Sequence, residues 1–189
     1  MNNHLEHIKY AYNSSTNCSF YSYNIFKINH KKIELDDIFN FDLLLIGDYS
    51  KLKKHQSERV INEGLFSSKH TYKTKVIDAY GPVIKSTITS NDFKKLSYEM
   101  FEKKMNSIID LMYNRKDLHE ADDLYNFFNQ SLIDLENFNL ENCDFYFLDS
   151  NLFSNTRKHK LSFIYSYFIS IVGINPDLNT FFILNFGND

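Results

Sequence analysis

Residues 161–172 read LSFIYSYFISIV, and residues 179–186 read NTFFILNF. Both stretches are rich in the aromatic and β-branched side chains that favour strands. The first stretch is apolar on both faces, which is typical of a central strand covered on both sides. Between the two stretches, Asn175-Pro176-Asp177 has proline at the second position of a turn. The sequence therefore predicts an antiparallel hairpin of two strands at the centre of a sheet.

Further strands are predicted wherever apolar, aromatic and β-branched residues concentrate over a short stretch. Gly81-Pro82 is a turn signal and joins the predicted strands 71–79 and 83–89. The predicted strands are residues 18–28, 42–48, 71–79, 83–89 and 143–148.

The first third of the chain also predicts short helical segments. Residues 50–65 predict a helix, with Ser50 as its N-cap and Gly64 at its C-terminal end. Residues 33–39 predict a short helix or a loop. Residues 5–12 predict either a short helix or a loose arm, so a flexible N-terminal arm over residues 1–15 is an open alternative.

The strongest helical pattern lies in the second half of the chain. Apolar side chains recur every three or four positions from Phe93 to Met112, so we predict a helix that Ser90 or Asn91 caps and that runs to about Asn114. A second helix is predicted over residues 118–138, and the short linker between the two favours an antiparallel hairpin. The order of strands, two helices and strands predicts an α+β fold: a mixed, largely antiparallel sheet of about five to seven strands packed against a helical hairpin.

Length and composition limit the class of protein. A chain of 189 residues predicts a single α+β domain over residues 1–189. The apolar share of 43% and the charged share of 24% exclude a collagen, a coiled coil and wholesale disorder. The N-terminus lacks the basic start and apolar run of a signal peptide, and residues 163–172 are half of the ~20 apolar residues that span a bilayer. We therefore expect a cytoplasmic protein that has no membrane partner.

Charge and cysteine content exclude further classes. The formal net charge is −3, and basic residues are mostly lysine, so nucleic acid is not an expected partner. Cys18 and Cys143 both lie in strand-like apolar settings and are expected to be reduced core thiols. The absence of a CxxC spacing excludes zinc-ribbon and thioredoxin sites.

No known catalytic motif is assembled in the sequence. It lacks a Walker loop, a dinucleotide-binding fingerprint and a Gly-x-Ser-x-Gly elbow, so we predict no catalytic residues, no metal ligands and no cofactor. Ser50, three residues after Gly47, is predicted to cap a helix. His4 and His7 belong to the expected solvated arm, and the histidines beside lysines are expected at the surface: His30, His55, His70 and His159.

One group of residues leaves an enzymatic alternative open. His119, Asp122 and Asp123 share one face of the second predicted helix. Such a face can hold a divalent cation or supply a general acid and base. Acidic residues in a first helical turn are also expected simply because the helix dipole favours them there. The alternative function is a metal-dependent hydrolase with a dispersed site around these residues.

Charge is unevenly distributed along the chain. Between Asp110 and Asp149 there are ten acidic residues against Arg115 and Lys116, a net charge of −8. Between Lys51 and Lys75 there are seven basic residues against two acidic ones, a net charge of +5. An acidic face speeds and directs association with a basic partner. The predicted partner-binding residues are Asp117, Glu120, Asp122, Asp123, Asp134, Glu136 and Glu141.

These observations predict a non-enzymatic, cytoplasmic protein-binding protein. The leading hypothesis is a bacterial immunity protein, or antitoxin, that neutralises a cognate toxin with a basic surface, such as a nuclease. An acidic protein surface can occupy a nuclease site in place of the phosphate backbone. A second alternative, besides the hydrolase, is an effector that binds a host protein through exposed aromatic side chains.

Overall fold

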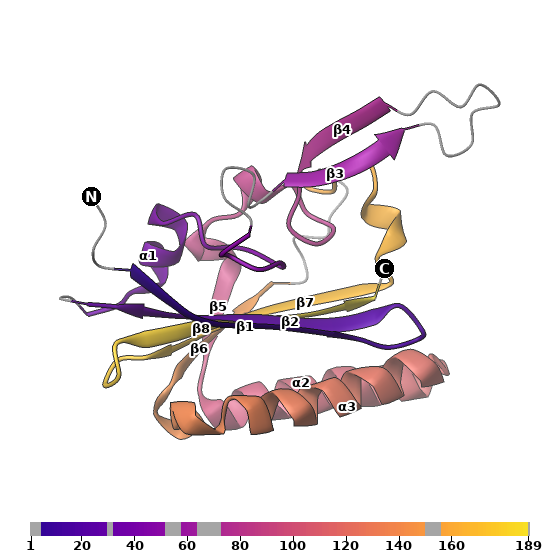
Figure 1. Ribbon diagram of the computed structural model, residues 1–189. Coiled ribbons are helices and arrows are strands. Elements are labelled where there is room, and N and C mark those ends of the chain that lie inside the picture. The colour runs from indigo at the N-terminus through magenta and orange to yellow at the C-terminus, as the bar shows by residue number, and fades with distance from the viewer. Residues whose placement is uncertain (1–4, 30–31, 52–57, 64–72, 150–155, 189) are drawn as a thin grey trace.

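A six-stranded antiparallel sheet forms the centre of the molecule in the computed structural model, which describes residues 5–29, 32–51, 58–63, 73–149 and 156–188 (Figure 1). The strand order is β1-β2-β8-β7-β6-β5. A separate two-stranded hairpin projects away from this sheet. The strands are β1 (Leu5–Ser14), β2 (Ser19–Ile28), β3 (Glu58–Glu63), β4 (Lys73–Asp78), β5 (Phe93–Leu96), β6 (Asp144–Leu148), β7 (Tyr167–Asn175) and β8 (Thr180–Asn188).

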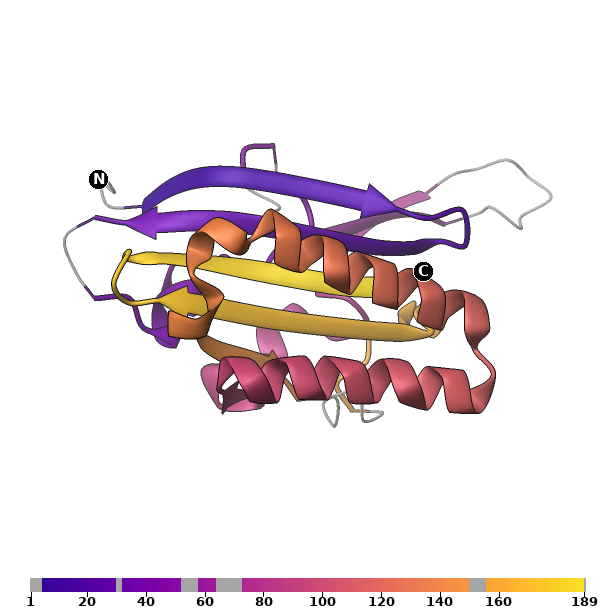
Figure 2. The same ribbon diagram turned by 90° about the horizontal axis from the view of Figure 1, so that it is seen from below.

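The two long helices cover one face of the sheet, which we call the helix face (Figure 2). They are α2 (Tyr98–Arg115) and α3 (Leu118–Asp134), with α3 against β2 and β8 and α2 against β5 and β6. The short helix α1 (Leu35–Asn40) lies on the opposite face. The described residues also form short 3-10 turns: η1 (Lys85–Thr87), η2 (Ser90–Asp92), η3 (Glu136–Phe138), η4 (Leu140–Asn142) and η6 (Ser162–Ile164). The predicted α+β fold with an antiparallel sheet and a helical hairpin is confirmed.

The predicted central hairpin is also confirmed. β7 and β8 pair in antiparallel register, with Val172 opposite Ile183, and they occupy the middle of the sheet. Gly173 is required at its position because the ring of Phe182 lies across it: an added Cβ would come within 2.1 Å of that ring. β7 begins only at Tyr167, so the first residues of the predicted strand form η6 instead.

The core of the helix face is built from rings and aliphatic side chains. Phe101 of α2 stacks on Phe145 of β6 with ring centroids 4.4 Å apart. Met105 of α2, Leu124 of α3 and Ile171 of β7 are fully buried in the same core. α2 begins where Ser97 accepts a hydrogen bond from the Met100 amide and ends at Lys116 in the left-handed conformation.

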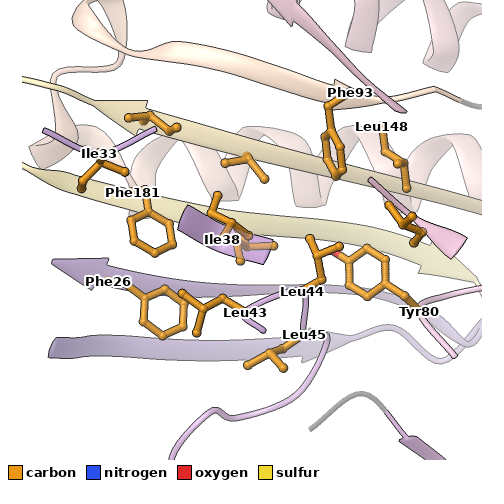
Figure 3. Packing of buried hydrophobic residues seen from close by; sticks show 14 of the residues in the cluster. Phe26, Ile33, Ile38, Leu43, Leu44, Leu45, Tyr80, Phe93, Leu148 and Phe181 are labelled. Carbon is orange, nitrogen blue, oxygen red and sulfur yellow. The ribbon is translucent and has the colours of Figure 1, made fainter. Parts of the chain in front are cut away.

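The opposite face of the sheet, which we call the loop face, is covered by α1 and by irregular segments (Figure 3). Leu43, Leu44 and Leu45 are buried on this face beside Phe26 and Phe181, but they do not form the strand predicted over 42–48. Their segment bonds to side chains of the sheet instead of to another strand. Asn185 donates to the Leu45 carbonyl at 2.9 Å, and Asn24 donates to the Gly47 carbonyl at 2.9 Å.

A row of polar side chains crosses the middle of the loop face. Ser22, Asn185 and Ser170, the polar row, are cross-strand neighbours on β2, β8 and β7, and each is 0% exposed. The Tyr80 hydroxyl, from the turn that covers the row, donates to Asn185 Oδ1 at 2.6 Å and lies 2.7 Å from Ser170 Oγ. Ser22 Oγ has no hydrogen-bond partner among the residues that the structure describes.

Several local predictions near the N-terminus are wrong. Leu5–Ser14 is the edge strand β1, neither a helix nor a loose arm, because its backbone pairs along most of its length with β2. Within the predicted helix 50–65, Glu58–Glu63 forms strand β3, and residues 52–57, 64 and 65 lie outside the described residues. The amide and the hydroxyl of Ser50 both bond to Asp48 Oδ1 in a turn.

Two predictions near the middle of the chain are wrong as well. Residues 83–89 form an isolated bridge at Val83 followed by η1. The predicted helix start at Ser90 or Asn91 is wrong, because η2 and β5 occupy this stretch and α2 begins only at Tyr98. The apolar residues from Phe93 onward look like one helical stripe in the sequence, but they belong to two different cores. Phe93 packs on the loop face, whereas Phe101 packs on the helix face.

Candidate protein-binding surface

Helix α3 and the two 3-10 turns that follow it form the acidic part of the molecule. The chain has no lysine or arginine from Asp117 to Asn142. α3 buries Ala121, Leu124, Phe128 and Ser131 against the sheet, so its polar residues are distributed over its two flanks and its outer side. The predicted partner-binding residues divide into four groups by position.

The first group lies on the flank of α3 that faces the β1–β2 hairpin. Asp123 accepts hydrogen bonds from Ser15 Oγ at 2.6 Å and from Asn17 Nδ2 at 3.2 Å. Three helical turns further on, Asp134 accepts from the Tyr21 hydroxyl at 2.7 Å. Burial, together with the Asp134 carboxylate, raises the pKa of Tyr21. These two carboxylates therefore tie α3 to the sheet, and both are only partly exposed.

The second group lies along the junction between α2 and α3. The Tyr113 hydroxyl of α2 donates to Asp122 Oδ1 of α3 at 2.6 Å, and this bond raises the pKa of Tyr113. Tyr125 of α3 lies close enough to interact electrostatically with Tyr113. Leu118 and Tyr125 are 53% and 49% exposed. We call Tyr113, Leu118, Asp122 and Tyr125 the seam: two exposed rings and an exposed aliphatic side chain around one carboxylate.

The third group lies where α3 ends. Glu136 and Glu141 line an open hollow of about 390 Å³ together with Tyr98, Leu132, Asn139 and Leu140. We call it the acidic hollow. The Tyr98 hydroxyl donates to Glu102 at 2.6 Å. Burial, with the nearby carboxylates of Glu102 and Glu141, raises the pKa of Tyr98 to about 12.

Two predicted residues lie at the start of α3. Asp117 occupies the N-cap position and is exposed, but its side chain makes no capping hydrogen bond. Glu120 lies in the first turn and is partly exposed. Both carboxylates are at the positive end of the helix dipole, which stabilises negative charge.

The residues of the hydrolase alternative are not brought together. Asp122 bonds to Tyr113 of α2, whereas Asp123 bonds to Ser15 of the β1–β2 turn, so the two carboxylates point to opposite flanks of α3. His119 is exposed on the same helix. Among the residues that the structure describes, no group of three or more His, Cys, Asp or Glu side chains could hold a metal ion.

Several polar contacts on the loop face are not predictable from the sequence. His159 was expected at the surface but is 8% exposed, and its Nε2 lies 2.7 Å from the Gly81 carbonyl. His7 lies on β1, with its Nε2 3.0 Å from Asn24 Oδ1. Lys85, also 8% exposed, pairs with Asp42 in a pocket of about 240 Å³. No local pattern indicates these contacts, because each joins residues at least 17 positions apart.

The two cysteines occupy different environments. Cys143 is buried, as expected, and burial raises the pKa of its thiol to about 11. Cys18 is exposed, so the prediction of a core thiol is wrong for this residue. It lies in the β1–β2 turn with a positive φ of 64°. Four histidines of the sequence predictions lie outside the described residues: His4, His30, His55 and His70. The side chains of the basic segment from Lys51 to Lys75 are also largely outside them.

No family model matches this chain, and neither the curated proteins nor the solved structures include a match. Over the described part of the chain, no helix has the length and apolar character needed to cross a membrane.

Proposed function

We propose that this protein is a non-enzymatic binding protein that recognises a basic protein partner through α3 and the turns after it. The biological role that fits best is that of a cytoplasmic bacterial immunity protein, or antitoxin, that neutralises a cognate toxin. The observation that carries the proposal is the run of 26 residues from Asp117 to Asn142, which contains seven acidic residues and no lysine or arginine.

The composition of the seam supports a binding role. Tyrosine is enriched in protein interfaces, where it supplies a large contact area and one hydrogen-bonding group. Tyr125 and Leu118 are about half exposed although they belong to a helix that packs against the sheet. A carboxylate beside exposed rings suits a lysine or arginine side chain, which can pair with the acid and lie over a ring.

The alternatives have less support. The hydrolase needs His119, Asp122 and Asp123 to converge, and the two carboxylates point to opposite flanks of α3. An effector that binds a host protein would use the same exposed side chains, so it differs from the leading proposal only in its partner. The two interaction proposals are separated by the identity of that partner.

The test is co-expression with the protein encoded by the gene immediately upstream. The proposal expects that this protein is toxic alone, that co-expression restores growth, and that the two purified proteins form a stable complex. A mixture that shows neither a complex nor inhibition of the toxin overturns the proposal.

A variant that removes the carboxylates of Asp122 in the seam and of Asp117 beside it tests the surface without changing the acidic hollow. Asp117→Asn with Asp122→Asn should slow association with the basic partner at least several-fold at low salt. Charges near the edge of an interface mainly affect the rate at which the two proteins associate. The matched control is Glu6→Gln with Asp36→Asn, two exposed acids of β1 and α1 outside the acidic surface. Equal association rates for the two variants would place the interface elsewhere.

A further inference from the structure

A pocket of about 240 Å³ lies on the loop face, on the opposite side of the sheet from α2 and α3 (Figure 1). We call it the lysine pocket, after Lys85. Four stretches of chain meet there: α1, the segment after it, the end of β4, and η1 with the residue that follows it. The volume corresponds to about eight water molecules, since each occupies ~30 Å³ in the liquid. The lysine pocket therefore has room for a molecule the size of a free amino acid, and not for a peptide segment.

The lysine pocket contains a buried cation. The side chain of Lys85 is 9% exposed, and its ammonium pairs with the carboxylate of Asp42, whose own side chain is 66% exposed. An ammonium group has three N–H donors. Among the described residues, Asp42 is the one hydrogen-bond acceptor of Lys85. Since a buried charge is costly unless it is paired and hydrogen-bonded, Lys85 has donors left for a ligand that enters the pocket.

Two carboxylates line the same pocket, and each has one oxygen left over. Asp78 accepts a hydrogen bond from the Ser86 amide at 3.0 Å through Oδ2. Asp42 bonds to Lys85 through Oδ1. No other described residue bonds to the second oxygen of either carboxylate. The groups that hold the pocket together therefore also offer acceptors to a ligand.

The charge pattern identifies the class of ligand. The described lining holds one ammonium, two carboxylates and the hydroxyl of Ser86. A simple anion would meet two like charges, and a simple cation would meet the like charge of Lys85 and leave its donors unused. A zwitterion has a group of the right sign for each: a carboxylate for Lys85 and an ammonium for Asp42 and Asp78. A zwitterion is therefore the best electrostatic match.

The rest of the lining is apolar. Ile38, Leu44 and Ile88 are buried in the core of the loop face, and Phe39 is partly exposed beside them. An aliphatic group placed against these side chains is removed from water, which favours binding. The ligand that satisfies both parts of the lining carries two opposite charges at one end and an aliphatic group at the other.

We infer that the lysine pocket binds a free α-amino acid with an aliphatic side chain. The carboxylate of the ligand accepts hydrogen bonds from Lys85 Nζ and the Ser86 hydroxyl, and its ammonium donates to Asp42 and Asp78. Its side chain lies against the apolar part of the lining. The inference goes beyond the proposed function, because the lysine pocket and the acidic helix lie on opposite faces of the sheet.

The probe that tests the inference is L-leucine, followed by two-dimensional NMR of the protein. Titration should produce saturable shifts of the amide signals of residues 38–44 and 85–88. N-acetyl-leucine lacks the ammonium and leucinamide lacks the carboxylate, so each should bind about tenfold more weakly or worse. The absence of a saturable shift with L-leucine, or an equal affinity for either blocked compound, would overturn the inference.

Variants of the pocket separate binding from a purely structural ion pair. Lys85→Met keeps the length of the side chain without its charge and should weaken L-leucine binding about tenfold or more. Asp78→Asn keeps an acceptor for the Ser86 amide, should weaken binding similarly, and serves as the test if Lys85→Met does not fold. The matched control is Asp36→Asn, an exposed acid of α1 outside the lining, which should leave the affinity unchanged.

The outcomes of the variants are distinct. An unchanged affinity for L-leucine in a folded pocket variant would contradict the assigned contacts. A lower melting temperature of Lys85→Met, together with no binding of L-leucine to the wild-type protein, would show that the ion pair is only structural. Failure of the L-leucine probe leaves the co-expression test of the proposed function unaffected.

Discussion

The two faces of the sheet are covered in different ways. On the helix face, regular helices meet regular strands through apolar contacts such as the stacked pair Phe101 and Phe145. On the loop face, irregular segments are held by hydrogen bonds to buried side chains, such as those from Tyr80 to Asn185 and from Asn185 to Leu45. A regular element can satisfy its own backbone, whereas a buried irregular segment needs partners from elsewhere. The polar row supplies those partners.

The largest expected effect lies on the helix face. Phe145→Ala removes a ring that is 1% exposed and that contacts the rings of Phe101 and Phe182. The free energy of unfolding should fall by about 3–5 kcal/mol, because the lost transfer energy and the remaining cavity add together. Urea denaturation followed by circular dichroism measures it. A loss below about 1 kcal/mol would mean that the helix face is not the tightly packed one.

The corresponding change on the loop face should cost less. Tyr80→Phe keeps the ring against Phe168 but removes the hydroxyl that Asn185 and Ser170 share. Leaving buried polar groups without a partner costs about 1–3 kcal/mol. The same urea experiment should give this smaller loss. A neutral result would show that the covering turn is held by apolar contact alone.

The pH dependence of stability at alkaline pH should also depend on the Tyr80 hydroxyl. Burial raises the pKa of Tyr80 in the folded protein. Above pH ~10 an unfolded tyrosine loses its proton while the buried one keeps it, so the folded state loses stability as pH rises. The wild-type protein should therefore lose up to about 1.4 kcal/mol per pH unit more than Tyr80→Phe above that pH. Parallel stability curves between pH 9 and pH ~11 would contradict this assignment.

The smallest expected effect compares the two serines of the polar row. Both are cross-strand neighbours of Asn185 and both are 0% exposed, but only Ser170 bonds to Tyr80. Ser170→Ala should cost about 1 kcal/mol, whereas Ser22→Ala should be neutral or slightly stabilising because its hydroxyl has no partner in the described part of the chain. Thermal unfolding of the two variants side by side measures the difference. Equal losses would show that Ser22 is hydrogen-bonded in solution.

The contrast between the faces also explains which elements the sequence predicts. The central hairpin and the paired helices follow from local sequence patterns. Each helix buries one apolar stripe against the sheet, and each strand of the hairpin is one continuous apolar run. The loop face depends on contacts between distant residues. Leu43–Leu45 is as apolar as a strand, yet its carbonyl partner is Asn185, 140 positions away. Phe93 and Phe101 form one apparent stripe although they enter different cores.

The acidic surface was predictable in part for the same reason. The absence of basic residues along α3 is visible in the sequence, and it draws attention to one helix. The division of its carboxylates among the sheet-facing flank, the seam and the acidic hollow was not predictable, since Tyr21, Ser15 and Tyr98 are remote in sequence from the acids beside them. Only the three-dimensional structure distinguishes the acids that hydrogen-bond α3 to the β1–β2 hairpin from the acids that can contact a partner.

The environments of the two cysteines make the natural chain ready for spectroscopic labelling. Cys18 is exposed, whereas burial holds the pKa of the Cys143 thiol at about 11, so a maleimide dye at neutral pH should attach to Cys18 alone. That position is next to Asn17, whose side chain bonds to Asp123 of α3. A fluorophore there would lie beside the acidic helix and could report the arrival of a partner without any engineered residue.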